Sequence, residues 1–370
     1  MKTRAAVLRS QPAPWEVVEV DLNDPGPGEV LVRMAYAGLC HSDDHIAKGD
    51  LVMPMPLNGG HEGSGIVEAV GPGVTELSIG DHVVGSFVPA CGKCRWCASG
   101  MQHLCDGGAH FGRGSMPDGT FRMFLDGAPV AKAGALGTFA ERNVFAEASC
   151  VRIAPEIPLD AACLVGCGVP TGFGAAINAA QVQAGDVVIV MGIGGLGANA
   201  LQGARAAGAR RIIAVDAVDS KQKLSYTFGA TDFTTSMEEA TQIARSLTNG
   251  QGADSVIITI GIISGEPIAE AFSAIRKAGI VAVASQGSPQ SSGIPINHFE
   301  LTMYQKRIQG VLYGNGSPRR EIPRLLEMYT EGRLQLDELI TTRYTLEQIN
   351  EGYQDMHDGK NIRGVIEFPL

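Results

Sequence analysis

The segment from Val187 to Gly197 constrains the fold of this chain more than any other. It reads VVIVMGIGGLG, so a run of apolar, mostly β-branched residues passes directly into glycines with GxGxxG spacing, and an Ala-rich stretch follows. A buried strand, a glycine turn and a helix in this order are typical of the first βα turn of a doubly wound parallel sheet. The sequence therefore predicts an α/β domain built around this turn.

The spacing of the glycines also predicts what the turn binds. Gly192 permits the tight turn, Gly194 lets backbone N–H groups approach a pyrophosphate, and Gly197 lets the helix lie close to the sheet. The dipole of the helix favours the anion. The residues between these glycines that complete the predicted site are Gly195 and Leu196.

A carboxylate at the end of the next strand predicts which dinucleotide is bound. Asp216 follows Arg211–Val215, where it can bind both ribose hydroxyls and repel a 2′-phosphate, which favours NAD. Lys221 is a further candidate for contact with the adenosine ribose. The alternative is a glycine-rich helix cap with a surface aspartate. The buried strand, the glycine spacing and the aspartate at the end of the next strand together favour a cofactor site over this alternative.

The pattern of the chain divides it into two domains. With 370 residues it is longer than one hydrophobic core usually serves. Residues 1–165 show short strands with turns, and residues 166–312 alternate strands with helices, as in a Rossmann-type domain. Residues 313–370 are expected to return and complete the first domain.

Charge and composition exclude several classes of partner. The formal net charge is −10 at pH 7, which disfavours nucleic acid and anionic membranes. The N-terminus has no apolar segment typical of an export signal, and the longest apolar stretch is broken by glycines. We expect a cytoplasmic protein in which most of the eight cysteines bind metal rather than form disulfides.

Four cysteines in residues 91–105 predict a structural metal site. Cys91, Cys94, Cys97 and Cys105 have C-x2-C-x2-C-x7-C spacing, which suits a closed tetrahedral zinc that ties down a loop-rich segment. The alternative is an iron–sulfur cluster. The long last gap, and Asp106 rather than proline after the last cysteine, argue against it.

A second set of candidate ligands is scattered along the first half of the chain. Cys40, His61 in Gly-His-Glu, and Cys167 in Gly-Cys-Gly would give the Cys₂His arrangement of a catalytic zinc with an open fourth position. Such a zinc is a Lewis acid that lowers the pKa of a bound alcohol so that an alkoxide exists near neutral pH. Alone, each residue is more often structural, since a single cysteine is usually a small buried hydrophobe.

The chain resembles the zinc-containing alcohol dehydrogenases of the medium-chain dehydrogenase/reductase family. The resemblance rests on GHExxGxVxxxGxxV from Gly60, on Gly80-Asp81-x-Val83, and on the Cys40, four-cysteine, Cys167, glycine and Asp216 motifs in family order. It implies a GroES-like catalytic domain and a Rossmann domain with the active site between them, two zinc ions per chain, and NAD. It also implies hydride transfer from an alcohol to NAD.

The resemblance implies roles for further residues. Cys40, His61 and Cys167 would hold the catalytic zinc, with Glu62 behind it and Asp43 orienting the histidine. Ser42 would take the proton of the alcohol, and His45 would pass it to solvent. Ser42 as a helix cap and His45 as a surface histidine are the alternatives. The resemblance implies that His41 and Arg363 contact the pyrophosphate and that Thr171 contacts the nicotinamide. It also implies that Phe87 and Leu51 line the substrate pocket.

The Glu300–Lys306 segment and the tail around Asn350–Tyr353 and Asn361–Ile366 resemble a bacterial branch, the nicotinoprotein or dye-dependent alcohol dehydrogenases. In that branch NAD stays bound and an external electron acceptor recycles it. The resemblance implies a primary alcohol or aldehyde of open chain length as the small-molecule substrate, with thiol-dependent formaldehyde dehydrogenase as the alternative. A long loop from Gly107 to Gly137 favours a homodimer over a tetramer. A non-enzymatic NAD-binding sensor or structural protein would be expected to lack a catalytic ligand, and none is lacking here.

Overall fold

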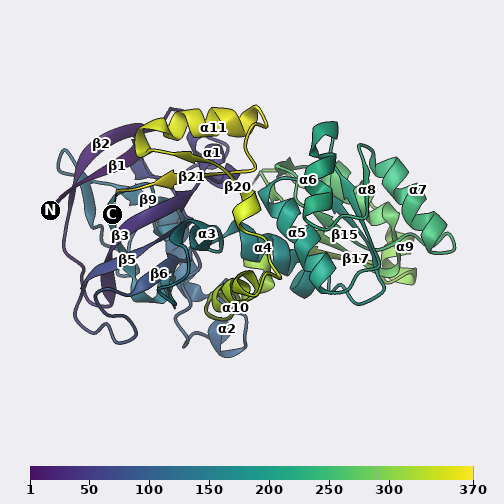
Figure 1. Cartoon of the computed structure of the whole chain (residues 1–370), viewed down its shortest axis with the longest axis horizontal. Helices are drawn as coiled ribbons and strands as arrows, with labels where there is room; N and C mark the ends of the chain where they lie inside the picture. Colours follow the sequence, from purple (N-terminus) through teal and green to yellow (C-terminus); the bar gives the residue numbers. More distant parts are fainter. Residues whose placement is uncertain (289, 370) are drawn as a thin grey trace. The chain divides into compact units, whose positions relative to one another are not determined.

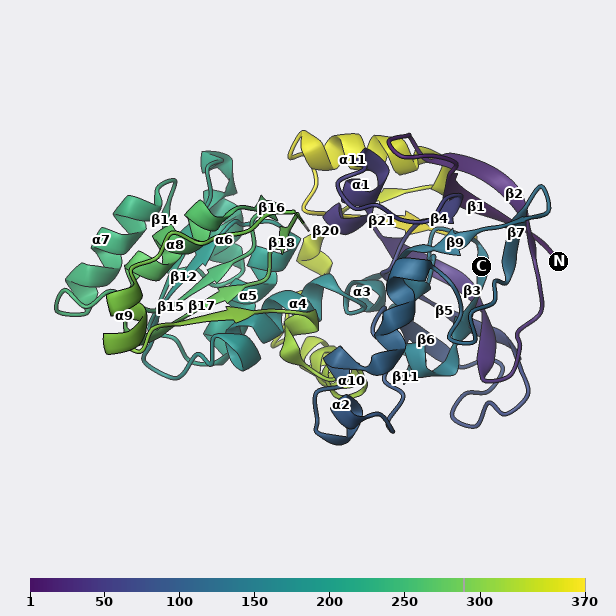
Figure 2. The ribbon, with the colours of Figure 1, turned by 180° about the vertical axis from the view of Figure 1, so that it is seen from behind.

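The computed structural model describes residues 1–288 and 290–369, and within them the chain forms two compact units. Unit 1 comprises Met1–Cys167 and Ser317–Leu370, and unit 2 comprises Gly168–Gly316. Figure 1 shows unit 1 with purple and blue strands and yellow C-terminal elements, and unit 2 in teal and green. Figure 2 shows the same units from behind. Unit 1 is therefore made from two separate stretches of chain.

Unit 1 contains two β-sheets, which confirms its predicted β-rich character. The first sheet has the order β8-β7-β2-β1-β4-β9. Its strands are β1 (Lys2–Leu8), β2 (Glu16–Leu22), β4 (Leu57–Asn58), β7 (Met123–Leu125), β8 (Ala128–Pro129) and β9 (Ala131–Lys132). The second sheet has the order β11-β6-β5-β3-β21-β20, with β10 also paired to β3. Its strands are β3 (Glu29–Gly38), β5 (Gly63–Val70), β6 (His82–Gly85), β10 (Arg142–Ala146), β11 (Cys150–Ile153), β20 (Ile340–Tyr344) and β21 (Arg363–Glu367).

Strand β3 lies at the centre of the second sheet and explains how the last segment of the chain is held. It pairs with β5, β10 and β21, and nearly all of its residues are buried. Because β21 pairs antiparallel with β3, with Val365 opposite Gly38, the returning segment becomes part of the sheet core. The helices of unit 1 are α1 (His41–Lys48), α2 (Arg95–Ala98), α3 (Leu159–Leu164), α10 (Pro318–Thr330) and α11 (Ile349–His357).

Unit 2 is a parallel sheet with the order β14-β13-β12-β15-β17-β19, as the fold class predicted. Its strands are β12 (Val187–Met191), β13 (Arg211–Val215), β14 (Asp232–Thr234), β15 (Ala253–Ile258), β17 (Ile275–Val283) and β19 (Arg307–Gly310), beside a small pair of β16 (Ile262–Ile263) and β18 (Gln286–Gly287). Its helices are α4 (Gly168–Gly174), α5 (Gly195–Ala206), α6 (Gln222–Thr227), α7 (Met237–Leu247), α8 (Gly265–Ala274) and α9 (His298–Met303).

The strand order of unit 2 places its switch point at β12. The chain continues from β12 to β13 on one side, whereas β15 lies on the other. Ligands of open α/β sheets bind beyond the carboxyl ends of the strands at such a point. In the part of the chain that the structure describes, no helix is long and apolar enough to cross a membrane.

A buried lysine in the core of unit 1 is a feature that the sequence did not indicate. Lys132 is 2% exposed, its ammonium donates to the Val144 carbonyl, and Met116 Sδ lies 3.5 Å from its Nζ. Burial lowers the pKa of Lys132 to about 7. Glu29, whose charge favours the protonated lysine, is itself bound by Arg122 at 2.7 and 2.9 Å.

The substitution Lys132→Met should therefore raise the melting temperature, and raise it more at low pH. The folded-state pKa lies below the ordinary value of 10.5, so the folded chain binds fewer protons than the unfolded chain between these values. The buried lysine therefore destabilises the folded state by its full amount below about pH 7. This destabilisation decreases as the pH rises and is lost near about pH 10. Thermal denaturation of both proteins at about pH 6.5 and 9.5 measures it, with the exposed Lys223→Met as control. A difference in melting temperature that does not change with pH would contradict this assignment.

Candidate active site and metal centres

Four potential metal ligands from three segments converge in unit 1. Cys40 precedes α1, His61 and Glu62 lie between β4 and β5, and Cys167 ends the first stretch of the unit. Their ligand atoms all lie within 4.8 Å of one another. The structure thus brings together residues separated by more than a hundred positions, including the three predicted catalytic-zinc ligands.

A buried carboxylate on α1 fixes the imidazole of this group. Asp43 Oδ2 lies 2.9 Å from His61 Nδ1, and Asp43 Oδ1 accepts a hydrogen bond of 3.0 Å from the Gly60 N–H. Asp43 is fully buried. With Nδ1 facing the carboxylate, Nε2 of His61 is the nitrogen available to a metal, which is the arrangement usual for metal-binding histidines.

Burial and mutual contacts shift the pKa values of the thiols and the carboxylate of this group. A hydrogen bond from Cys167 lowers the pKa of Cys40 well below its usual value, and the same bond together with burial raises the pKa of Cys167. Burial raises the pKa of Glu62 to about 7, although the Arg363 guanidinium opposes this. Two free thiols, an imidazole and a carboxylate in one buried cluster suit zinc by both number and donor type.

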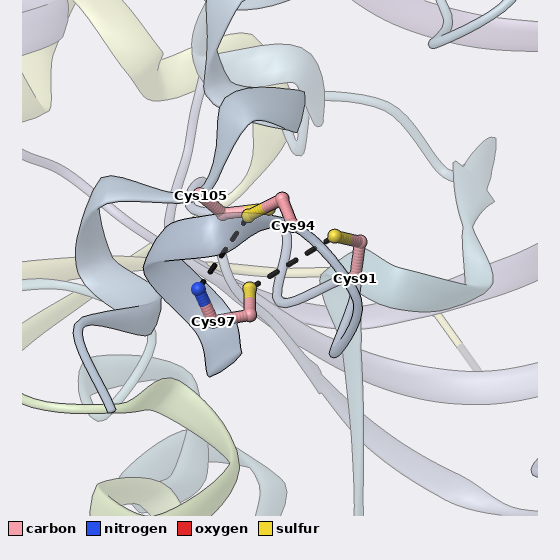
Figure 3. A group of neighbouring side chains, drawn as sticks. All are labelled: Cys91, Cys94, Cys97 and Cys105. Atoms are coloured by element: carbon pink, nitrogen blue, oxygen red, sulfur yellow. Dashed lines mark hydrogen bonds between the residues drawn. The ribbon is translucent and has the colours of Figure 1, made fainter. Parts of the chain in front are cut away.

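The four predicted structural ligands form a second group in unit 1. The side chains of Cys91, Cys94, Cys97 and Cys105 converge around α2 (Figure 3). The Sγ atoms of Cys91 and Cys97 are 3.9 Å apart, as are those of Cys94 and Cys105. Zinc–sulfur bonds of about 2.3 Å in a tetrahedron place sulfurs roughly 3.8 Å apart, so these distances fit zinc.

The start of helix α1 carries the residues predicted to move the proton. The helix begins at His41, with Cys40 before it, so Ser42 lies in the first turn and does not cap the helix. The Ser42 Oγ lies 3.8 Å from the Cys40 Sγ, next to the ligand group. His45 is in the last turn, and its Nδ1 lies 2.9 Å from Asp50 Oδ2.

The structure places Arg363 behind the ligand group. At the start of β21, its Nη2 donates to Glu62 Oε2, and both side chains are buried. Sequence reasoning had assigned Arg363 to pyrophosphate and had not anticipated this ion pair. His41 is exposed on the surface of unit 1.

Aromatic side chains lie beside the imidazole of His61. The ring of Phe87 meets the His61 ring edge-on at a centroid distance of 5.6 Å, and Phe111 meets Phe87 at 6.1 Å. Leu51 is half-buried and packs against the core of unit 1. The sequence did not indicate Phe111, which lies in the 3-10 helix Asp106–Arg113.

The glycine turn of unit 2 has the geometry that its spacing predicted. Gly192 has a φ of 95°, and a Cβ on Gly197 would lie 2.0 Å from the Gly192 carbonyl oxygen. Gly194 immediately precedes α5, and a Cβ placed there meets no atom within 4 Å. Gly195 and Leu196 form the first turn of α5, whose N-terminus has no side-chain cap. Open space at an uncapped helix N-terminus suits a pyrophosphate.

Two further predicted cofactor residues belong to unit 2. Asp216 accepts hydrogen bonds from the Ile193 N–H at 2.7 Å and from Lys221 Nζ at 2.9 Å, so it also holds the glycine turn in place. The Thr171 hydroxyl is buried, and no group among the described residues is its hydrogen-bond partner. A buried hydroxyl without a partner is costly, and a carboxamide such as that of nicotinamide would satisfy it.

Comparison with known proteins relates the chain to two protein-family models and to several relatives. The family described as alcohol dehydrogenase GroES-like domain matches residues 26–155, and the family described as zinc-binding dehydrogenase matches residues 195–331. The chain is 48% identical over 366 residues to the NDMA-dependent alcohol dehydrogenase of Amycolatopsis methanolica, covering 99% of each chain. It is 45% identical over 370 residues to alcohol dehydrogenase B of Mycobacterium tuberculosis, covering 100% of this chain and 99% of that protein.

A solved structure extends the similarity to the whole fold. The crystal structure of benzyl alcohol dehydrogenase from Acinetobacter calcoaceticus has a TM-score of 0.91 and 31% identity, with all of both chains covered. Full-length identity near one half, together with two zinc-ligand groups and a dinucleotide turn, shows the family. The chain belongs to the zinc-dependent medium-chain alcohol dehydrogenases and is an NAD(P)-linked enzyme of that family.

Proposed function

We propose that this protein oxidises primary alcohols reversibly to aldehydes, with NAD as the hydride acceptor. The observation that carries the proposal is the convergence of Cys40, His61, Glu62 and Cys167 within 4.8 Å beside Ser42. These residues would hold a zinc ion, which would supply a Lewis acid for ionisation of the alcohol, and NAD held by unit 2 would supply the hydride acceptor. The four-cysteine group takes a second zinc with a structural role.

Each nearby side chain has a separate task in this proposal. Asp43 keeps the His61 ring oriented and, in the neutral ring, holds the proton on Nδ1, so that the lone pair of Nε2 is directed to the metal. The Ser42 hydroxyl accepts the proton that leaves the alcohol while it releases its own, and His45 carries the released proton to solvent. Glu62 and Arg363 compensate each other's charge behind the ligands, so a buried carboxylate is kept near the metal at reduced electrostatic cost.

The proposed cofactor is NAD, bound by unit 2. The turn from Gly192 to Gly197 and the N-terminus of α5 receive the pyrophosphate, and the Asp216 carboxylate binds the adenosine ribose. Lys221 pairs with Asp216 and thereby lies beside the same ribose position. Thr171 contributes its unpartnered hydroxyl to the nicotinamide end. Pyrophosphate contacts from His41 and Arg363 remain a prediction from the family resemblance.

The aromatic pair favours a substrate with an aromatic or extended apolar group. Phe87 contacts the ring of a proposed zinc ligand, and Phe111 continues the apolar surface. The similarity to benzyl alcohol dehydrogenase supports the same class of primary alcohol. The resemblance to the nicotinoprotein branch implies that NAD is retained in the site and that an external acceptor reoxidises it, and one relative is named an NDMA-dependent alcohol dehydrogenase. The cytoplasmic location remains a prediction.

We also propose that the chain forms a homodimer through the edge of the sheet in unit 2. Strand β19 ends the sheet order, so its outer edge is available for pairing. Helix α9, which precedes it, exposes Phe299 by 60% and Met303 by 63%. A second copy of the chain would cover both the edge and these apolar side chains.

The first experiment tests activity, cofactor and metal together. Purified, extensively dialysed protein should contain two zinc ions per chain and oxidise benzyl alcohol. Denaturation of one sample should release one NAD per chain. In the native sample, turnover should require an artificial electron acceptor. Turnover with added NAD alone from an empty site would contradict cofactor retention but not the oxidation of alcohols, whereas no oxidation of any primary alcohol would contradict the proposed activity.

The variant Cys40→Ser should lose one zinc and slow alcohol oxidation by at least about 100-fold, because a ligand of the proposed Lewis acid is removed. Its four-cysteine zinc should remain. Cys163→Ser is the matched control, since Cys163 is buried in the same unit, belongs to neither group, and donates to the Asp160 carbonyl as a serine would. Metal analysis and initial rates measure both variants. Undiminished oxidation by Cys40→Ser would refute the ligand assignment.

Two glycine variants separate cofactor contact from folding. Gly194→Ala should leave the melting temperature unchanged, because its φ of −106° and open surroundings accept a methyl group, yet weaken NAD binding by about tenfold or more. Gly197→Ala should lower the melting temperature, because the new Cβ would collide with Gly192. Thermal denaturation and measurement of bound NAD distinguish the two. Unchanged NAD binding by Gly194→Ala would place the pyrophosphate elsewhere.

The variant Met303→Asp should shift the protein from dimer to monomer, because a carboxylate would have to be buried against the second copy. Light scattering coupled to gel filtration gives the mass. Ile79→Asp, an exposed apolar residue of unit 1, serves as control. A dimer that survives Met303→Asp unchanged would place the interface on another surface.

A further inference from the structure

Three carboxylates in and just after helix α1 each have a different basic partner. Asp43 lies 2.9 Å from His61 Nδ1. Asp44 pairs with Lys48 Nζ and His357 Nε2, both at 2.9 Å. The third, Asp50, lies 2.9 Å from His45 Nδ1. Asp43 and Asp44 are therefore already engaged, and Asp50 is the acid that serves His45.

The backbone after α1 brings Asp50 back to the helix. Gly49 ends the helix with a φ of 85°, a left-handed conformation that turns the chain sharply. As a result the N–H groups of Asp50 and Leu51 both donate to the His45 carbonyl, at 2.9 and 3.2 Å. The Asp50 side chain is thus held near the ring of the residue whose backbone it contacts.

This contact determines how the His45 ring can act. A carboxylate beside Nδ1 favours the tautomer with the proton on Nδ1, which leaves a lone pair on Nε2. Within residues 1–288 and 290–369, Nε2 has no hydrogen-bond partner.

We propose that Asp50 is a positioning residue for proton transfer, acting through His45; this inference rests on the proposed role of His45 in alcohol oxidation. A proton released during oxidation bonds to Nε2, which converts the neutral ring to an imidazolium. The same Nε2–H bond then breaks as the proton passes to water or buffer. Asp50 keeps its contact with Nδ1 throughout and undergoes no net chemical change.

The test compares Asp50→Asn, His45→Ala and the double variant in the holoenzyme. The readout is NADH formation during the first turnover with benzyl alcohol, which does not depend on product release or on the acceptor. Both single variants should slow this step by about tenfold, with zinc and NAD content unchanged. The double variant should be no slower than His45→Ala, since Asp50 acts only through that ring. Added imidazole should restore His45→Ala, and Asp50→Glu should restore most of the rate.

Each other outcome contradicts a specific part of the argument. Slow turnover in His45→Ala with normal turnover in Asp50→Asn would overturn the role of Asp50 and leave the proposed proton route intact. Normal turnover in both would overturn the route through His45 and with it this inference. If the losses multiply in the double variant, Asp50 acts on something other than His45.

Asp44→Asn is the matched structural control. It removes a neighbouring carboxylate of the same helix that pairs with Lys48 and His357 rather than with His45. Asp44→Asn should lower the melting temperature. Any effect that it has on the rate of the first turnover should be the same in the otherwise unchanged protein and in the His45→Ala variant. If the effects of Asp44→Asn and His45→Ala on the first turnover were as strongly non-additive as those of Asp50→Asn and His45→Ala, the helix as a whole, and not Asp50, would set the rate.

Discussion

The buried carboxylate of Asp43 is the interaction on which the catalytic region depends. It joins helix α1 to the connection between β4 and β5, because it accepts the Gly60 N–H and lies against His61 Nδ1. Burial raises the pKa of this carboxyl, and the neighbouring His61 opposes that shift. Helix α1 follows Cys40 and carries Ser42 and His45. Asp43 therefore fixes His61, a proposed metal ligand, against the helix that follows Cys40 and carries the residues proposed to move the proton.

The return of the chain completes this arrangement from the opposite end of the sequence. Strand β21 is held between β20 and β3, and its first residue, Arg363, reaches Glu62. Helix α11 supplies His357, which binds Asp44 on the outer side of α1. The Arg363–Glu62 ion pair and the His357–Asp44 contact thus tie the C-terminal stretch to Glu62 and to helix α1, and the buried Glu62 is compensated by a base far away in the chain. Such compensation is needed because an unpaired buried charge is strongly destabilising.

Unit 2 relies on close backbone contact instead of charge. Gly192 and Gly197 approach so closely that no side chain fits between them, and Asp216 fastens the turn through the Ile193 N–H. The strands behind the turn are buried and β-branched, so the turn rests on a rigid sheet. The segment that carries the four-cysteine group has few buried residues. Its sulfurs take the place of an apolar core in holding the segment together.

The sequence by itself determined the elements whose signal is local. Strands β12 and β13 run over Val187–Met191 and Arg211–Val215 as predicted, because buried parallel strands are uninterrupted apolar runs. The glycine turn and the four-cysteine group could also be predicted from the sequence, because residues close together in the chain form them. Strand β19 was missed because an edge strand such as Arg307–Gly310 is polar and exposed.

Only the tertiary structure decided which distant residues meet. Cys40, His61 and Cys167 could be grouped from sequence by family resemblance alone, because their approach depends on how separate strands and loops pack. The Arg363–Glu62 pair follows from the register of β21 against β3, which no local pattern encodes. The contact between Asp50 and His45 depends on the left-handed turn at Gly49, and the burial of Lys132 depends on packing around it. Propensity and spacing act over a few residues, whereas these contacts are fixed by the packing of the whole unit.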